Sequence, residues 1–210
     1  MIPTGQYRVA AVQMVSGDNV AANLDQAAPL IAQAAKQGAQ LVLLPENFGF
    51  MGLHGRDKIA IRERDGDGMQ QAFLSAAARR HHIVLIGGSV PITCDDPARV
   101  KQAMLVYGGD GERIARYDKI HLFRFTQGDE DYDEAKTISA GSTTQSLAAD
   151  CGRVGLSICY DVRFPELYRA FTDLALIVVP AAFTVPTGAA HWETLLRARA
   201  SGVDGATRPS

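Results

Sequence analysis

The chain has 210 residues, of which 47% are hydrophobic and 21% charged, and its formal net charge is -2. That length supports one domain with a sizeable core. The near-neutral charge gives no field of one sign, so we expect neither nucleic acid nor an anionic membrane as a partner.

The first half of the sequence predicts strands that alternate with helices. A short apolar run at 7–14 is typical of a buried strand, and Asp18 is expected to cap a helix that begins near Asn19 and ends at Gly38. The expected buried face of this helix carries Val20, Leu24, Ala27 and Ile31. Further strands are predicted at 39–46 and 82–90. Between them, a helix at 68–80 is expected to turn Met69, Phe73, Leu74 and Ala77 inward.

The second half begins with a predicted hairpin, whose turn is the glycine-rich run at 108–111. Residues 121–145 are polar and predict an irregular loop, with the acidic run Asp129 to Glu134 exposed to solvent. Strands are then expected at 153–161 and 174–183, and helices at 164–173 and 189–200. The pattern as a whole predicts the α/β class with a mixed sheet.

The ends of the chain carry little patterning. The N-terminus lacks the basic segment and the long apolar segment of a secretory signal, and the apolar stretch at 174–183 is too short to cross a bilayer as a helix. The sequence therefore predicts a cytoplasmic protein. The last ten residues are small and polar and predict an unstructured tail, either a natural terminus or the mark of a truncated reading frame.

Three cysteines occur in the chain: Cys94, Cys151 and Cys159. An odd number at wide spacing is a poor disulfide framework, and none has the spacing of a zinc site. We therefore expect reduced thiols and no bound metal. Cys159 stands out because it ends a predicted strand.

Three predicted strands end by presenting a polar side chain that is capable of chemistry. These are Glu46 in LLPEN, Lys119 in YDKIHLF and Cys159 in GLSICYDVRFPELYR. Each has an ordinary structural interpretation by itself: a surface charge, a solvated lysine and a buried small thiol. Loops beyond strand ends are where α/β proteins place their sites, so the three together favour a functional cluster.

These three segments resemble the signature segments of the nitrilase superfamily of carbon–nitrogen hydrolases. The resemblance extends over about residues 9–200 and includes AVQM, SAG before the cysteine strand, VVPAAFT and HWETLLRARA. It implies an α-β-β-α sandwich and association into a homodimer or larger homo-oligomer. It also implies hydrolysis of a small-molecule amide to a carboxylate and ammonia with no cofactor.

The resemblance assigns Cys159 as the nucleophile, Glu46 as the general base and Lys119 as the partner of the oxyanion. Glu134 matches a further glutamate of the family, with a solvated acidic residue as the alternative. The backbone N–H of Tyr160 is expected to bind the oxyanion, and Arg163 or Arg124 the carboxylate of the substrate. An ion pair that fixes the local turn is the alternative for Arg163. His121 and His191 are expected to be structural.

Within the superfamily, the cysteine segment and the HWE helix are most similar to deaminated glutathione amidases and omega-amidases. A nitrilase or a carbamoyl-amino-acid hydrolase is the alternative within the enzyme class. Members of the family continue past the helix at 189–200, so residues 1–200 are expected to form an incomplete hydrolase domain and 201–210 a disordered or non-native tail. The alternative from another class is therefore a truncated, inactive member that serves as a binding or assembly scaffold.

Overall fold

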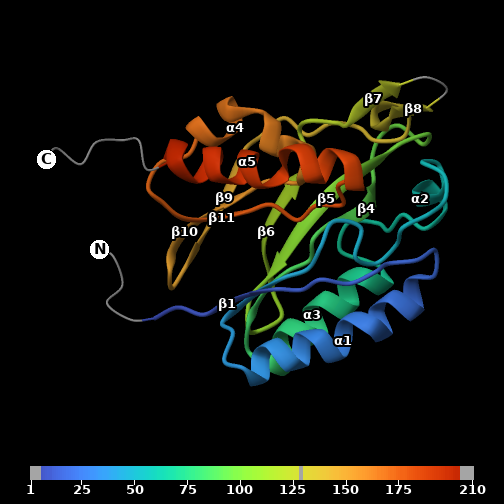
Figure 1. Ribbon diagram of the computed structural model, residues 1–210. Helices are drawn as coiled ribbons and strands as arrows, with labels where there is room; N and C mark the ends of the chain where they lie inside the picture. The colour runs from blue at the N-terminus through green and yellow to red at the C-terminus, as the bar shows by residue number, and fades with distance from the viewer. Residues whose placement is uncertain (1–5, 128–129, 204–210) are drawn as a thin grey trace, which may run out of the picture.

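The computed structural model describes residues 6–127 and 130–203. Two β-sheets pack face to face, and each is covered on its outer side by helices (Figure 1). Helices α1 and α3 form one outer layer, and α4 and α5 form the other. The expected α-β-β-α sandwich is confirmed.

The first sheet mixes parallel and antiparallel pairing. Its parallel part consists of β1 (Val9–Ala11), β2 (Leu41–Leu43) and β3 (Val84–Ile86). Its antiparallel part consists of β4 (Val90–Thr93), β5 (Val100–Tyr107) and β6 (Arg113–Asp118). Both β3 and β4 pair with β5, because the single strand expected at 82–90 is broken at Gly87 and Gly88 and resumes along the same neighbour. The hairpin predicted around residues 108–111 is the β5–β6 hairpin.

Helices α1 (Val20–Lys36) and α3 (Met69–His81) cover this sheet. Asn19, not Asp18, caps α1: its side chain accepts a hydrogen bond from the N–H of Ala22 at 3.0 Å, which satisfies a free donor of the first turn. The chain leaves α1 through Gly38, whose φ of 84° favours glycine. The prediction that Met69 faces inward was wrong, because its side chain is 59% exposed at the first position of α3.

The second sheet is smaller and orders its strands β11-β10-β9. Its strands are β9 (Gln145–Ala149), β10 (Gly152–Leu156) and β11 (Leu174–Val178). Helices α4 (Pro165–Arg169) and α5 (Val185–Val203) lie on its outer side. Ring contacts hold α5 there: Trp192 packs on Phe183 with centroids 4.9 Å apart, and the guanidinium of Arg199 lies 5.7 Å from the Tyr168 ring.

Two apolar cores follow from these layers. One lies between the first sheet and α1 with α3, around Ile31, Leu74 and Leu85. The other lies between the sheets and joins them. Its side chains come from the first sheet (Leu41, Ile86, Met104, Val106 and Tyr117) and from the second (Leu147, Val154, Leu156, Ile158 and Val178).

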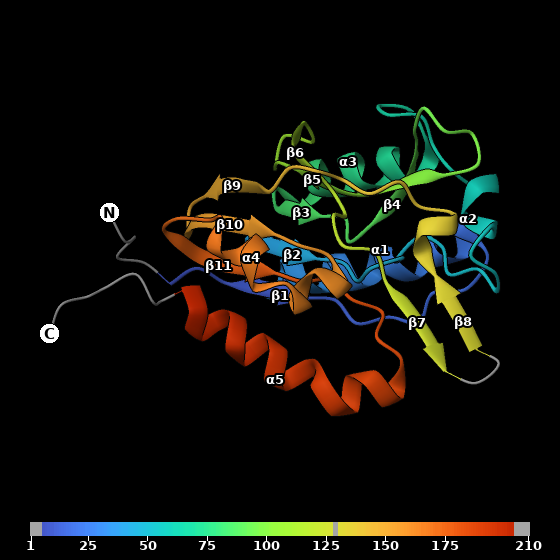
Figure 2. The ribbon, with the colours of Figure 1, turned by 90° about the horizontal axis from the view of Figure 1, so that it is seen from above.

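The expected irregular loop at 121–145 was wrong in part. The segment contains a β-hairpin of β7 (Arg124–Gln127) and β8 (Glu130–Asp133), followed by the 3₁₀ turn η1 (Glu134–Lys136). A further short helix, α2 (Asp57–Ala60), lies near this hairpin (Figure 2) and was not predicted. Asp129 of the expected acidic run lies outside the described residues, as do residues 204–210 of the expected tail.

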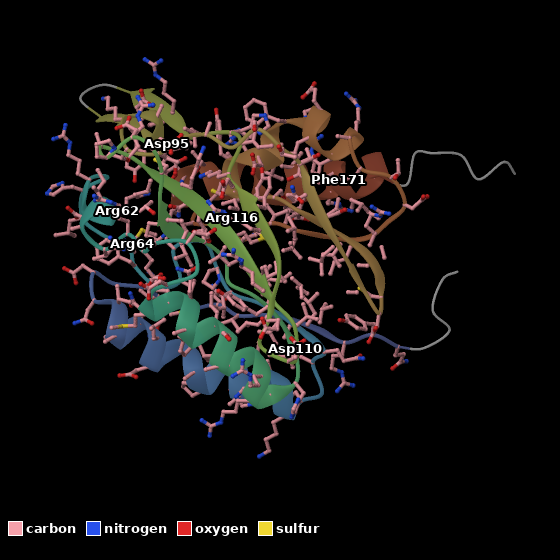
Figure 3. The ribbon with its side chains drawn as sticks, turned by 180° about the vertical axis from the view of Figure 1, so that it is seen from behind. Arg62, Arg64, Asp95, Asp110, Arg116 and Phe171 are labelled. Carbon is pink, nitrogen blue, oxygen red and sulfur yellow. The ribbon has the colours of Figure 1, made fainter. Side chains whose placement is uncertain are left out.

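The β6 strand carries an ion-pair network. Arg116, labelled in Figure 3, pairs with Asp65 at 3.0 Å and with Asp118 at 2.8 Å, and Arg113 also pairs with Asp65. Among the described strands β6 pairs only with β5, so it is an edge strand. Charged side chains on an edge strand discourage pairing with a strand of another molecule. The network also connects β6 to the loop at 61–68. The connection lies next to the end of the strand, where the chain turns into the interior.

Candidate active site

Glu46 lies in a tight loop just beyond the end of β2. The loop is shaped by a close approach between Gly88, with a φ of 45°, and the carbonyl of Pro45, which a Cβ at position 88 would meet at 1.9 Å. Ser89 fixes the loop further by accepting a hydrogen bond from the N–H of Asn47 at 2.8 Å. The Glu46 side chain is therefore held inward, and the residue is only 5% exposed.

Lys119 follows β6 and is buried between two carboxylates. Its Nζ donates to Oε1 of Glu46 at 2.9 Å and to Glu134 at 2.9 Å. Burial disfavours the charged form of Lys119, but the two carboxylates outweigh it and raise the pKa above its ordinary value. The side chain is thus a fixed cation at neutral pH.

Glu134 is not the solvated acidic residue that its loop suggested. Besides the ion pair with Lys119, its Oε2 accepts a hydrogen bond from the N–H of Phe123 at 2.7 Å. Its side chain is 13% exposed. The residue is thus a second carboxylate on Lys119, and it ties the lysine to the segment that leads into β7.

Cys159 opens the 3₁₀ turn η2 (Cys159–Arg163) directly after β10. Its φ of 48° is in the left-handed region, an uncommon conformation for a residue with a side chain and one that recurs at functional sites. Its N–H donates to the carbonyl of Pro180 at 2.9 Å, which anchors the turn to the segment after β11. The thiol therefore projects from a sharp bend at the end of a buried strand.

Glu46 and Cys159 line the same cavity, and the Glu46 carboxylate is close enough to the thiol to raise its pKa. Ala182 donates its N–H to Oε2 of Glu46 at 2.9 Å and so fixes this carboxylate. Burial raises the pKa of the Cys159 thiol well above its ordinary value, and the negative charge of Glu46 adds to that effect, while Lys119 opposes it. The resting thiol is therefore protonated, and its nearest carboxylate is positioned to take the proton.

Asp161 fixes this turn relative to β6. Its buried carboxylate accepts hydrogen bonds from the hydroxyl of Tyr117 at 2.6 Å, the N–H of Ile158 at 2.8 Å and the N–H of His121 at 2.9 Å. The ring of His121 lies 2.7 Å from the same carboxylate and stacks on Phe164 with centroids 3.7 Å apart. His121 thus has a structural role, as expected.

A cavity of about 840 Å³ opens onto the three residues. Glu46, Lys119 and Cys159 line it together with Glu134. Six aromatic side chains also line it: Phe50, Phe123, Phe125, Tyr132, Tyr160 and Phe183. A cavity of this size fits a small organic molecule, with a few polar groups gathered at one place in an apolar wall.

Comparison with known proteins agrees with this geometry. The model of the carbon–nitrogen hydrolase family matches residues 8–202. The chain belongs to the carbon–nitrogen hydrolase family.

Named relatives lie in the same family. The chain is 38% identical to a deaminated glutathione amidase of Synechocystis, over 92% of this chain and 73% of that one. It is 37% identical to an omega-amidase of Homo sapiens, over 92% of this chain and 70% of that one. The crystal structure of the C. elegans NitFhit protein superposes with a TM-score of 0.85 at 36% identity, covering 95% of this chain and 49% of that one.

Of the three residues predicted to bind the substrate, two line the cavity and the third is not among its described lining residues. Tyr160 and Arg163 line the cavity, and the guanidinium of Arg163 lies 5.7 Å from the ring centres of both Tyr160 and Phe183. Arg163 also approaches Nδ1 of His191 at 3.3 Å. Arg124 is not among the described lining residues: its side chain is 74% exposed and lies 3.9 Å from Asp133. The structure thus places Arg163, and not Arg124, on the cavity that Glu46, Lys119 and Cys159 line.

Sequence reasoning missed one charged residue of this site. Lys58 on α2 lines the cavity and is partly buried. Its short helix has no amphipathic repeat and no capping side chain, so no pattern marked it out. Among the described residues, no group of three or more His, Cys, Asp or Glu side chains is placed to hold a metal ion, and no helix is long and apolar enough to cross a membrane.

Proposed function

We propose that this carbon–nitrogen hydrolase cleaves a small amide that bears a carboxylate, such as deaminated glutathione or an α-keto ω-amide. The observation that carries the proposal is that Cys159, Glu46 and Lys119 line one cavity, with Lys119 hydrogen-bonded to Glu46, and that Arg163 lines the same cavity. The names of the relatives, a deaminated glutathione amidase and an omega-amidase, support the choice of substrate.

In the first half of the reaction, Glu46 takes the proton of the Cys159 thiol while the sulfur attacks the amide carbon. The new C–S bond leaves a tetrahedral intermediate with a negative oxygen. Lys119 and the N–H of Tyr160 offset that charge. Glu46 then passes its proton to the amide nitrogen, the C–N bond breaks, and ammonia or an amine departs from the thioester.

The second half returns the enzyme to its starting state. Glu46 takes a proton from water, which attacks the thioester carbon, and the intermediate is stabilised by the same groups. The C–S bond breaks and the sulfur leaves as a thiolate, which recovers the proton from Glu46. The net reaction is amide and water to carboxylate and amine. Each proton that Glu46 accepts is delivered one step later, so no other base is needed.

The carboxylate of the substrate is expected to bind Arg163. A guanidinium pairs well with a carboxylate, and that of Arg163 lies on the cavity wall between two aromatic rings. The Arg163 guanidinium contacts the imidazole of His191, which carries no negative charge, so the guanidinium can still pair with an anion. A cytoplasmic location and assembly into a homodimer or larger homo-oligomer stay predictions.

The test is release of ammonia or amine from a panel of deaminated glutathione, α-ketoglutaramate, a carbamoyl amino acid and a simple nitrile. We expect turnover of one of the first two by the unaltered protein and none by Cys159→Ala with an unchanged fold. Turnover of the nitrile or the carbamoyl compound alone would replace the substrate assignment. Activity that survives in Cys159→Ala, or silence across the panel from folded protein, would refute the proposed reaction and favour the inactive scaffold.

A further inference from the structure

The loop that bears Glu46 is held on both sides of that residue. Before it, Gly88 approaches the carbonyl of Pro45 so closely that no Cβ fits at position 88. After it, Asn47 has a φ of 59°, in the left-handed region. Asparagine enters that region more readily than most residues, but the conformation still costs free energy and the surrounding structure must hold it. The contacts of Asn47 therefore fix how the chain leaves Glu46.

Gln102 on β5 supplies such a contact from the interior. Its side-chain amide donates to Oδ1 of Asn47 at 2.6 Å and to Oγ of Ser89 at 2.7 Å. The same Oγ accepts a hydrogen bond from the backbone N–H of Asn47 at 2.8 Å. The side chain of Asn47 is thus held by Gln102, and its backbone by Ser89, which Gln102 also contacts.

Gln102 contacts Lys119 as well, through its backbone. Strand β5 pairs with β4 on one edge and with β6 on the other (Figure 1). Just past the end of β6, the N–H of Lys119 donates to the carbonyl of Gln102 at 3.0 Å. One residue therefore joins the loop of Glu46 to the backbone of Lys119, whose Nζ donates to the Glu46 carboxylate at 2.9 Å.

The side chain of Gln102 is not the one that stability alone would favour. The residue is only 2% exposed, and its Oε1 is buried with no hydrogen-bond partner in the described part of the protein. A buried acceptor without a partner costs free energy, and an apolar side chain of similar length would avoid that cost. The benefit of the amide therefore lies in its N–H groups, which reach Asn47 and Ser89.

We propose that Gln102 is a positioning residue for catalysis: its amide holds Asn47 in the left-handed conformation and so fixes the place of Glu46. The Glu46 carboxylate then stays within reach of both the Cys159 thiol and the Lys119 ammonium. The effect on turnover rests on the proposed function, since Glu46 moves each proton in that reaction. Gln102 is not among the described residues that line the cavity, so it acts through Asn47 and does not touch the substrate.

The first test is turnover of α-ketoglutaramate by Gln102→Met, which keeps the length of the side chain and removes its donors. We expect kcat to fall by about 10- to 100-fold, because a small displacement of a catalytic group has a cost of that order. KM should stay within about two-fold, since a residue outside the cavity does not bind the substrate. A rise in KM with an unchanged kcat would overturn the proposal.

The second test needs no substrate of the enzyme. Burial and the charge of Glu46 raise the pKa of the Cys159 thiol, while Lys119 lowers it. If Gln102→Met releases the Glu46 carboxylate, alkylation of Cys159 by iodoacetamide should reach half of its maximal rate at a lower pH than in the unaltered protein. Mass spectrometry of the peptide that contains Cys159 follows the reaction apart from the other cysteines. An unchanged midpoint would refute the proposal.

Gln70 provides the matched control. It is a glutamine of α3, only 1% exposed, whose side chain packs against the same loop at Gly49. Neither its Nε2 nor its Oε1 has a hydrogen-bond partner among the described residues. Gln70→Met therefore makes the same substitution beside the same loop without removing a hydrogen bond, and should leave kcat and the alkylation midpoint unchanged. Equal effects of the two variants would mean that packing, and not the Gln102 amide, positions the loop.

A double-variant cycle tests the path through Asn47. Asn47→Gly removes the side chain that Gln102 contacts and still permits a positive φ. If Gln102 acts through Asn47, the double variant should lose little more kcat than Asn47→Gly alone, whereas losses that multiply would refute that path. Circular dichroism and thermal unfolding show whether each variant is folded. Should Gln102→Met not fold, Asn47→Gly by itself should show the lower kcat and the lower alkylation midpoint.

The two readouts separate this inference from the function on which it rests. If the unaltered enzyme does not cleave α-ketoglutaramate, that substrate assignment fails, but the alkylation midpoints still decide whether Gln102 positions Glu46. If the unaltered enzyme cleaves it and Gln102→Met matches the unaltered enzyme in both readouts, only the role of Gln102 is refuted.

Discussion

The chemistry of Cys159 depends on which neighbour controls its proton. Lys119 favours the thiolate, but burial and the Glu46 carboxylate prevail and keep the thiol protonated. At rest, the negative charge of Glu46 adds to the effect of burial. In the proposed reaction the same carboxylate removes the proton during attack.

Glu46→Gln should separate these two roles. The amide has no negative charge and cannot raise the pKa of Cys159, so the thiol should titrate at lower pH than in the unaltered protein. Turnover should nevertheless fall by roughly 10²- to 10⁴-fold, since the general base is lost. The ultraviolet absorbance of the thiolate, followed against pH, measures the midpoint.

The control for this titration is the double variant Glu46→Gln/Cys159→Ala, whose signal contains only Cys94, Cys151 and the tyrosines. A midpoint for Cys159 that is unchanged or higher in Glu46→Gln would contradict the arrangement described for the site. Turnover that survives the change would show that another group serves as the base.

Most of the catalytic residues were predictable because each ends a strand within a recognisable segment. Glu46, Lys119 and Cys159 are brought together as the resemblance implied, and Glu134 joins them. Arg124 was predicted as the alternative to Arg163, and its side chain is not among the described lining residues of the cavity, because sequence does not reveal which arginine turns inward. Lys58 was not predicted because its place on the cavity wall depends on where the fold puts α2.

At the scale of elements, η2 determines how the nucleophile is presented. The turn begins with Cys159 in a left-handed conformation, and Asp161 connects it to Tyr117 and His121 near the end of β6. The same carboxylate thus fixes the position of the turn that bears Cys159 and of the segment that bears Lys119. Its loss should disturb stability and catalysis together.

We expect Asp161→Ala to reduce the free energy of unfolding by about 3 kcal/mol or more, because several buried donors lose their acceptor at once. The value of kcat should also fall, although Asp161 does not reach the substrate. Tyr168→Phe is a suitable control, since it removes one buried hydroxyl whose acceptor, Ser157, lies at 2.9 Å, and it should cost only about 1 kcal/mol.

Denaturant unfolding and single-substrate kinetics measure both effects. If Asp161→Ala lost stability no more than Tyr168→Phe, the carboxylate would not be the connection between η2 and β6. A stable variant with normal kcat would contradict its positioning role altogether.

The elements that sequence reasoning found are those with a strong local signal. The β5–β6 hairpin has a glycine-rich turn, and α1 has an apolar face at helical spacing with Gly38 at its end. The β7–β8 hairpin is polar, so its strands were read as a loop. It forms because backbone pairing and the contacts of Glu134 supply what hydrophobic alternation does not.

At the scale of the whole molecule, the core between the sheets holds the two halves together. Leu156 of β10 is fully buried there among side chains of the first sheet. The sequence predicted that its strand would be apolar. The pattern of this strand did not predict which sheet it would face, because an apolar strand packs equally well on many partners. The order of the layers came from the family resemblance.

Leu156→Ala should lower the free energy of unfolding by about 2–5 kcal/mol, through lost burial and the cavity that remains. Val15→Ala, at a side chain that is 85% exposed, should stay within about 0.5 kcal/mol of the unaltered protein. Urea denaturation of both variants provides the comparison. Equal stability of the two variants would mean that the sheets are held together by other contacts.

The candidate catalytic residues are contributed by both sheets. Glu46 and Lys119 follow strands of the first sheet, whereas Cys159 follows a strand of the second. One sheet alone therefore positions either the carboxylate and the ammonium or the thiol, but not all three. A small shift of one sheet against the other would separate Cys159 from Glu46 while each sheet stayed intact, so the accuracy of the site depends on how rigidly the two sheets pack.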